Sequence, residues 1–255
     1  MQAKRRGSTT EKYIKLKGNK MKTLIIVPAY NESENIERVV ADLNKNCPEC
    51  DYLIVNDCST DNTAQIAKDN GFNFISLCCN LGIGGGVQSG YIYAYKNGYD
   101  CAIQIDGDGQ HDPAYIKRLT DPIEKGEADV VIGSRFIECE GFQSSGMRRF
   151  GIKFLSSLIK LMCGAYVRDV TSGFRAVNRK FIEIFAKEYA DDYPEPEAIV
   201  SAKLRGGKIL EVPVVMRERE GGVSSISPMK SIYYMIKVSL SIIIYRITYK
   251  GGAKK

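Results

Sequence analysis

Residues 102–113 read "AIQIDGDGQHDP", and the fold prediction starts from this stretch. An apolar run ends in three carboxylates, Asp106, Asp108 and Asp112, within seven residues. Carboxylates at that spacing repel one another and need a counter-charge. Asp106 and Asp108 can both turn toward one hard cation at a strand end, and Gln110 adds a neutral oxygen. The stretch predicts a buried strand followed by a site for Mg²⁺ or Mn²⁺; a surface Asp-Gly turn is the alternative.

Strands and helices are expected to alternate on both sides of this stretch. Apolar, β-branched runs predict strands, and helical spacing or a glycine or proline start predicts the helices between them. The expected strands are 23–27 (ending at Pro28), 52–55, 72–77, 101–105, 130–132 and 209–216, with one more after the turn 171–175. The expected helices are 63–68, 84–96, 113–124, 150–163 and 195–204, with another after Asn31 as its N-cap. This alternation favours a Rossmann-like α/β fold, a mostly parallel sheet covered by helices on both faces.

Polar and glycine-rich segments follow the predicted strands and would meet at one edge of the sheet, where ligands bind in such folds. These segments are 28–32, 56–61, 80–86, 106–112 and 133–135. The glycines of 82–86 suit either phosphate binding by backbone N–H groups or a tight turn, and they match no standard nucleotide motif. His111, the only histidine, is expected to support the acidic pair rather than to react.

Charge is distributed unevenly along the 255 residues, whose formal net charge is +6. Residues 1–20 carry seven Lys/Arg and one acid, and residues 227–255 carry six Lys/Arg and no acid. The body between them is therefore acidic, with a net charge of −6, which speaks against a nucleic-acid surface. Basic ends beside apolar residues suit an anionic membrane surface instead.

Three regions are expected along the chain. Residues 1–20 are predicted to be a disordered extension or tag, 21–226 the catalytic domain, and 227–255 an amphipathic basic C-terminal helix at a membrane surface. Lys237 and Arg246 interrupt the apolar run 231–248, so it predicts an interfacial helix rather than a transmembrane span. Residues 1–20 lack the apolar segment of a signal peptide, so the eight cysteines, the CxxC pair Cys47 and Cys50 included, are expected to be reduced cytosolic thiols.

Five motifs resemble those of the family 2 glycosyltransferases, which have the GT-A fold. They are IIVPAYNESENI (25–36), VNDCSTDNT (55–63), IQIDGDGQHDP (103–113), VIGSRF (131–136) and TSGFRAVNR (171–179). The resemblance is strongest to the dolichyl- and polyprenyl-phosphate mannosyl- and glucosyltransferase branch and to its bacterial polysaccharide relatives. It implies inverting, metal-dependent transfer of a hexose from a UDP-, GDP- or dTDP-sugar. The implied acceptor is a polyprenyl phosphate or a lipid-linked or polysaccharide glycan in cell-envelope glycan synthesis.

The resemblance also implies roles for individual residues. Those implied for the nucleotide sugar are Pro28, Tyr30, Glu32, Asp57, Asp106 and Arg175. Those implied for the metal are Asp106, Asp108 and Gln110, and those for the acceptor are Arg135, Arg148, Arg219 and Ser224. The implied catalytic residues are Asp106, Asp108, Arg135 and Glu197. The chain departs from the family at Ser225, where those relatives usually have a lysine, and this puts the identity of the acceptor in question.

The implied enzyme would act as a peripheral protein at the cytoplasmic, inner face of a membrane, with a homo-oligomer or a membrane partner protein as possible assemblies. A phosphate acceptor needs no general base, whereas a sugar hydroxyl needs a carboxylate, for which the candidates are Asp191, Asp192, Glu195 and Glu197. Two other functions stay open. A sugar-phosphate nucleotidyltransferase should show a GxGTRLxP-like loop, where this chain has VPAYNESENI. A non-catalytic GT-A scaffold should have lost Asp106 or Asp108, and both are present.

Overall fold

The computed structural model describes residues 21–138, 146–192, 194–217 and 228–249. Within these ranges the side chains of Met147, Arg148 and residues 228–232 are not described. The expected extension 1–20 and the expected acceptor residues Arg219 and Ser224 therefore lie outside the described residues, as does the side chain of Arg148.

A seven-stranded sheet with the order β3-β2-β1-β4-β6-β5-β7 forms the centre of the fold. The strands are β1 Thr23–Ala29, β2 Asp51–Asn56, β3 Phe74–Ser76, β4 Cys101–Gln104, β5 Val130–Ser134, β6 Arg175–Asn178 and β7 Ile209–Pro213. Neighbouring strands are parallel, except that β6 runs antiparallel to both β4 and β5. The prediction of a mostly parallel α/β sheet is confirmed.

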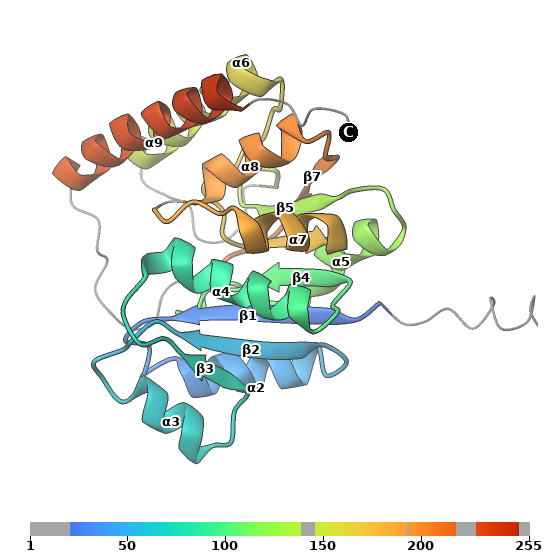
Figure 1. Ribbon diagram of the computed structural model, residues 1–255, viewed down its shortest axis with the longest axis vertical. Coiled ribbons are helices and arrows are strands. Elements are labelled where there is room, and N and C mark those ends of the chain that lie inside the picture. Colours follow the sequence, from blue (N-terminus) through green and yellow to red (C-terminus); the bar gives the residue numbers. More distant parts are fainter. Residues whose placement is uncertain (1–20, 139–145, 193, 218–227, 250–255) are drawn as a thin grey trace, which may run out of the picture.

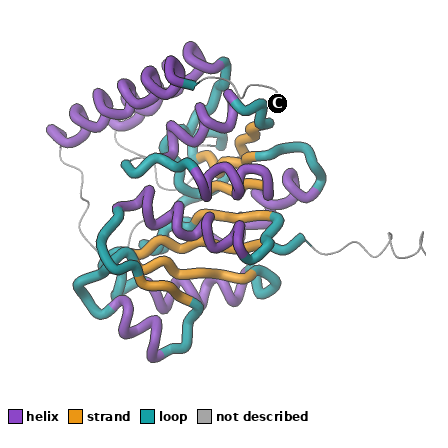
Figure 2. Tube along the Cα trace, in the orientation of Figure 1, coloured by secondary structure: helices purple, strands orange, loops and turns teal. Residues whose placement is uncertain are grey.

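Helices cover both faces of this sheet (Figures 1 and 2). They are α2 Ile36–Asn46, α3 Thr63–Asp69, α4 Gly82–Lys96, the 3₁₀ turn η1 Pro113–Tyr115, α5 Ile116–Glu124, α6 Gly146–Cys163, α7 Arg179–Lys187, α8 Pro194–Leu204 and α9 Pro228–Thr248. Successive strand residues point to opposite faces. Leu24 and Ile26 therefore pack with residues of α4 and of α6 to α9, whereas Ile25 and Val27 pack with α2, α3 and α5.

Two local predictions at the end of β1 are wrong. β1 continues through Pro28, whose carbonyl accepts a hydrogen bond from the Gly107 N–H at 3.2 Å. Asn31 does not cap a helix, because α2 begins only at Ile36. Asn31 instead has a φ of 56°, and its Oδ1 accepts from the Thr60 N–H at 2.8 Å.

The prediction of reduced thiols is wrong for Cys47 and Cys50, which are joined by a disulfide. The turn after α2 brings their Cα atoms to 5.6 Å, which is within the usual range for a disulfide. Among the described residues the free cysteines are Cys58, Cys78, Cys79, Cys101 and Cys163.

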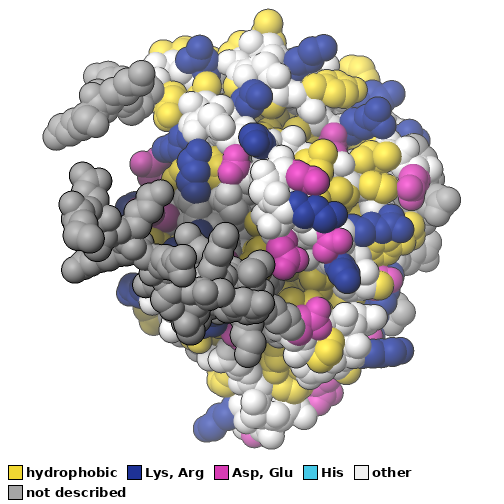
Figure 3. All heavy atoms as spheres, turned by 90° about the vertical axis from the view of Figure 1, so that its right-hand side faces the viewer, with side chains coloured by type: hydrophobic (Ala, Val, Ile, Leu, Met, Phe, Trp, Pro, Cys, Tyr) yellow, Lys and Arg dark blue, Asp and Glu magenta, His cyan; other side chains and the backbone are white. Residues whose placement is uncertain are grey.

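β1, β2 and β4 point to one edge of the molecule, on the left in Figure 1, where α4 and the segment before α8 also lie. On the opposite side, where these strands begin, Lys and Arg side chains are interspersed with Asp and Glu (Figure 3). No helix in the described ranges is both long enough and apolar enough to cross a membrane. α9 packs on α6 and α8 through the buried Val238 and Ile242.

Candidate active site

The acidic pair lies in a tight loop against the end of β1. A Cβ atom at Gly107 would lie 2.9 Å from the carbonyl oxygen of Pro28, so only glycine fits between Asp106 and Asp108. Gly109 has a φ of 75°, a left-handed conformation that glycine adopts without strain. The two glycines therefore let the chain turn sharply while both acids stay at the edge of the sheet.

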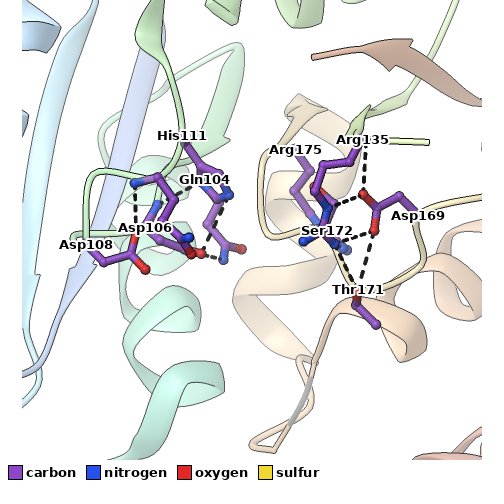
Figure 4. Close-up of polar contacts among 10 residues, drawn as sticks. Gln104, Asp106, Asp108, His111, Arg135, Asp169, Thr171, Ser172 and Arg175 are labelled. Atoms are coloured by element: carbon purple, nitrogen blue, oxygen red, sulfur yellow. Dashed lines mark hydrogen bonds and ion pairs between the residues drawn. The ribbon is translucent and has the colours of Figure 1, made fainter. Parts of the chain in front are cut away.

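The oxygen atoms of this loop suit a hard divalent cation. The Asp106 side chain is 37% exposed, and its Oδ1 accepts from Gln104 Nε2 at 3.2 Å (Figure 4). Asp108 Oδ1 accepts from the Gln110 N–H at 3.0 Å, which brings Gln110 to the same loop. The carboxylate oxygens of Asp106 and Asp108 and the amide oxygen of Gln110 are the kind of ligand that Mg²⁺ and Mn²⁺ prefer. The residues present thus fit the ion that the sequence predicted.

His111 supports the loop from within. Its ring is 4% exposed and stacks on Phe174 with 4.9 Å between the ring centroids. Its Nδ1 accepts from the Asp106 N–H at 3.1 Å, which assigns the ring proton to Nε2, 3.7 Å from Asp106 Oδ2. This arrangement agrees with the supporting role expected for the histidine.

Arg135 forms a buried ion pair that the sequence did not predict. Asp169, fully buried, accepts from Arg135 Nε and Nη2, each at 2.7 Å, and from the Arg135 backbone N–H at 3.1 Å (Figure 4). Arg135 Nη2 also donates to Thr171 Oγ1 at 3.2 Å. The resemblance implied a catalytic and acceptor-binding role for Arg135, and in the structure its guanidinium donates to Asp169.

Arg175 also donates to protein groups. It has no exposed surface, and its Nε and Nη2 donate to the Ser172 carbonyl while Nη1 donates to the Glu195 carbonyl at 3.1 Å. Its hydrogen bonds therefore hold two backbone segments together, and the role in nucleotide-sugar binding that the resemblance implies for Arg175 stays a prediction. The segment it holds reaches the acidic pair, because a Cβ at Gly173 would lie 3.1 Å from Asp106 Oδ1.

Of the two acids at the start of α8, Glu195 lies near Asp106 and Arg175, whereas Glu197 does not. Removal from water raises the pKa of the Glu195 carboxyl, and the nearby Arg175 guanidinium partly offsets this effect. The charge of Asp106 raises the pKa further, while a hydrogen bond from Gln104 lowers it. Glu197, which the sequence predicted as catalytic, accepts a hydrogen bond from Ser241 of α9. The two acids share the first turn of α8 but face different parts of the molecule.

The residues expected to hold the nucleoside come from the ends of β1 and β2. Tyr30 is half exposed, and Glu32 Oε2 accepts from Asn35 Nδ2 at 2.7 Å. Asp57 is almost fully buried, and its Oδ1 accepts from the Leu81 N–H at 2.7 Å, which ties the start of α4 to β2. The structure thus brings Pro28, Tyr30, Glu32 and Asp57 to the same edge as the acidic pair.

The glycine-rich start of α4 is a site of close packing. The Gly84 N–H donates to the Asp191 carbonyl at 3.0 Å, so it is engaged by the protein itself. A Cβ at Gly84 would lie 2.0 Å from the carbonyl oxygen of Ala190, and only a glycine allows this approach. At this position the tight-packing interpretation describes the glycine better than phosphate binding does.

Comparisons with known proteins agree with this fold. The polyprenol monophosphomannose synthase of Mycolicibacterium smegmatis is 29% identical over 228 residues, which are 86% of each chain. The undecaprenyl-phosphate mannosyltransferase of Micrococcus luteus is 31% identical over 216 residues, 81% of this chain and 88% of the relative. Glucosyl-3-phosphoglycerate synthase from Mycobacterium tuberculosis, solved with Mn²⁺, UDP and glucosyl-3-phosphoglycerate, superposes with a TM-score of 0.68 at 20% identity, over 96% of this chain and 86% of that one.

A mostly parallel sheet with an acidic pair after a central strand defines the GT-A class of glycosyltransferases, and this protein is such an enzyme. The family description "Glycosyl transferase family 2" matches residues 24–185. The chain belongs to glycosyl transferase family 2. The sugar-phosphate nucleotidyltransferase and the non-catalytic scaffold gain no support from these comparisons.

Proposed function

We propose that this enzyme transfers a hexose from a nucleoside-diphosphate sugar to a polyprenyl phosphate, with Mg²⁺ or Mn²⁺ at the acidic pair. The observation that carries the proposal is the placement of Asp106 and Asp108 at the strand edge, close to the turn that leads into β6. The names of two bacterial relatives, a polyprenol monophosphomannose synthase and an undecaprenyl-phosphate mannosyltransferase, support this acceptor.

On the donor side, the residues of the β1 and β2 ends would hold the nucleoside, and Asp106, Asp108 and Gln110 would hold the ion. When bound, the ion offsets the charge that develops on the leaving diphosphate. The acceptor oxygen would attack the anomeric carbon from the face opposite the leaving group, which inverts its configuration. A phosphate acceptor is already anionic near neutral pH, so this reaction needs no general base.

On the acceptor side, a basic cavity of about 420 Å³ lies between α6 and the loop before β6. Its lining residues are Phe136, Arg149, Ile152, Lys153, Ser156, Ser157, Tyr166 and Arg168. Three of them are cationic and none is acidic, so the cavity favours an anion. Phe136 directly follows Arg135 in the chain, and Arg168 directly precedes Asp169. The Arg135–Asp169 ion pair therefore connects this cavity to the edge where the active site lies. We place the acceptor phosphate here.

The test measures label transfer from UDP-, GDP- and dTDP-hexoses to polyprenyl phosphate in detergent, with Mn²⁺, with Mg²⁺ and with EDTA. A lipid-linked glycan ending in a hydroxyl serves as the second acceptor. Ion-dependent transfer to the phosphate is the expected result. Transfer only to the glycan would contradict the phosphate acceptor and would direct attention to Glu195 as a base. No transfer from any donor to either acceptor would contradict the proposed function.

Lys153→Ala is expected to raise the KM for polyprenyl phosphate by about tenfold, because one hydrogen bond to a charged group contributes about 1.5–3 kcal/mol. The kcat should change little, because Lys153 does not touch the reacting atoms in this assignment. Lys117→Ala, at an exposed lysine of α5 outside the cavity, is the matched control. Equal KM values for both variants would contradict the placement of the acceptor.

α6 and α9 lie side by side and form the surface that we propose as membrane-facing (Figure 1). The exposed apolar side chains of this surface are Phe150, Phe154, Leu161, Tyr233, Ile236, Leu240, Ile244 and Ile247. On α9 they recur every three or four residues, opposite the buried Val238 and Ile242. Neither helix contains an acid, and exposed or half-exposed basic residues flank the stripe, which suits an anionic bilayer. The expected location at the cytoplasmic, inner face is part of this proposal.

Replacing both Leu240 and Ile247 by glutamate is expected to lower binding to vesicles of phosphatidylcholine and phosphatidylglycerol by more than about tenfold. Each buried apolar side chain of this size contributes about 1.5–3 kcal/mol, and the new charges are repelled by the anionic lipid. Leu210→Glu alters an exposed leucine of β7 and serves as the control. Flotation of the double variant at the wild-type level would contradict this surface.

A further inference from the structure

The segment just before α8, Tyr189–Asp192, lies between α9 and the start of α4, at the edge where the central strands end (Figure 1). We refer to it as the pre-α8 segment. Together with the first turn of α8 it touches parts of the active site on one side and α9 on the other. Neither Lys237 nor Ser241 of α9 was predicted to take part in the reaction.

The inner side of this region packs closely on residues of the active site. The Asp191 carbonyl accepts from the Gly84 N–H, and the Ala190 carbonyl lies where any side chain at Gly84 would stand. One residue into α8, the Glu195 carbonyl accepts from Arg175 Nη1 at 3.1 Å. A shift of this region would therefore move both the start of α4 and the support of the Ser172–Gly173 turn beside Asp106.

The outer side is attached to α9 by two polar contacts. Lys237 Nζ forms an ion pair with Asp192 Oδ2, and Ser241 Oγ donates to Glu197 Oε2. Lys237 and Ser241 are four residues apart, so they project from the same side of the helix, along with the buried Val238. A polar cavity of about 320 Å³ lies between them and the pre-α8 segment, and is lined by Tyr189, Ala190, Asp191, Asp192, Glu197, Lys237, Val238 and Ser241.

We propose that Lys237 and Ser241 are positioning residues for sugar transfer, and that they act through the pre-α8 segment and the first turn of α8. They touch no reacting atom. They hold the outer side of a region whose inner side fixes Gly84 and Arg175. Because α9 also carries the proposed membrane surface, the helix would link docking to active-site geometry; this last step rests on the proposed function.

The test compares two serines of the same helix. Ser241→Ala removes the contact with Glu197, whereas Ser239→Ala removes only a hydrogen bond to the Met235 carbonyl within α9. Activity is measured in detergent, so that vesicle binding does not limit the rate. Ser241→Ala combined with Lys237→Met is expected to lower kcat by about tenfold or more, with less than about a twofold change in KM, because small misplacements of active-site groups reduce the rate. Ser239→Ala should behave as the wild type, and Ser241→Thr should restore the rate when Lys237 is retained.

A second measurement does not depend on activity. Amide hydrogen exchange of residues 82–87 and 197–200 is expected to become faster in the double variant, because the hydrogen bond from Gly84 to Asp191 opens more often. Unchanged exchange and unchanged kcat would overturn the proposal. A fall in kcat that is equally large in Ser239→Ala, or that Ser241→Thr does not restore, would also overturn it. Failure of the wild type to transfer sugar would contradict the proposed function alone, while the exchange experiment still decides this inference.

Discussion

Asp108→Asn is expected to lower sugar transfer by about two to three orders of magnitude and to abolish Mn²⁺-dependent nucleotide binding. Asparagine has nearly the same shape, and its Oδ1 can still accept from the Gln110 N–H, so the loop should keep its turn. The variant loses one negative charge at the place where a hard divalent ion needs it. Loss of one preorganised electrostatic group in an active site typically costs about 10²–10³ in rate. Isothermal titration with UDP, GDP and dTDP, with and without Mn²⁺, measures the nucleotide affinity.

Asp69→Asn is the control for this experiment, because Asp69 is an exposed aspartate at the end of α3, away from the acidic loop. It should bind the same nucleotide with the same dependence on Mn²⁺ as the wild type. Treatment with EDTA should reduce nucleotide binding by the wild type to that of Asp108→Asn. Added Mn²⁺ should restore binding in the wild type but not in Asp108→Asn. Metal-dependent binding that persists in Asp108→Asn would show that the acidic pair is not the metal site.

Asp169→Ala is expected to lower the free energy of unfolding by about 3–5 kcal/mol, the usual cost of removing one partner of a buried ion pair. Asp169 is fully buried, and Arg135 is 6% exposed. Without the carboxylate, the guanidinium and the Arg135 backbone N–H would both lose their acceptor in a site that water barely reaches. Denaturation by guanidinium chloride, followed by circular dichroism, measures the change.

Glu183→Ala provides the contrast, because it breaks an exposed ion pair between Glu183 and Lys187, one turn apart on α7. Surface pairs of this kind contribute about 0–1 kcal/mol, so this variant should unfold close to the wild type. A loss of less than about 1 kcal/mol in Asp169→Ala as well would mean that Arg135 finds another partner, and that the pair does not fix the rim of the active site.

The layout of the fold could be predicted from local patterns. Strands β1, β2 and β4 are apolar because both of their faces are covered, and the acids after β4 signal the strand end directly. α7 was not predicted, although it has clear signals in retrospect. The Asn178 side chain caps this helix by accepting from the Phe181 N–H at 3.2 Å, and Phe181, Ile182 and Phe185 form its buried face. An apolar stripe of only three residues in a short helix is easily missed beside stronger patterns.

The residues of the candidate site also fall into two groups: those whose position follows from the strand order, and those whose partners come from distant segments. Pro28, Asp57, Asp106 and Asp108 follow strands, and a parallel sheet brings strand ends to one edge whatever the loops do. The partners of the charged side chains depend instead on segments far apart in the chain. Asp169 stands 34 residues from Arg135, Glu195 stands 20 from Arg175, and Ser241 stands 44 from Glu197.

Local sequence patterns were therefore enough to predict the alternating strands and helices, the edge where the site lies, and the acidic pair with its oxygen donors. Long-range packing, in contrast, gives Arg135 and Arg175 their protein hydrogen-bond partners and brings Glu195, rather than Glu197, close to Asp106. The physical reason is that hydrophobic periodicity and turn chemistry act over a few residues. A buried charge, by contrast, must find its counter-charge or hydrogen-bond partners wherever packing brings them, and no local pattern records that choice.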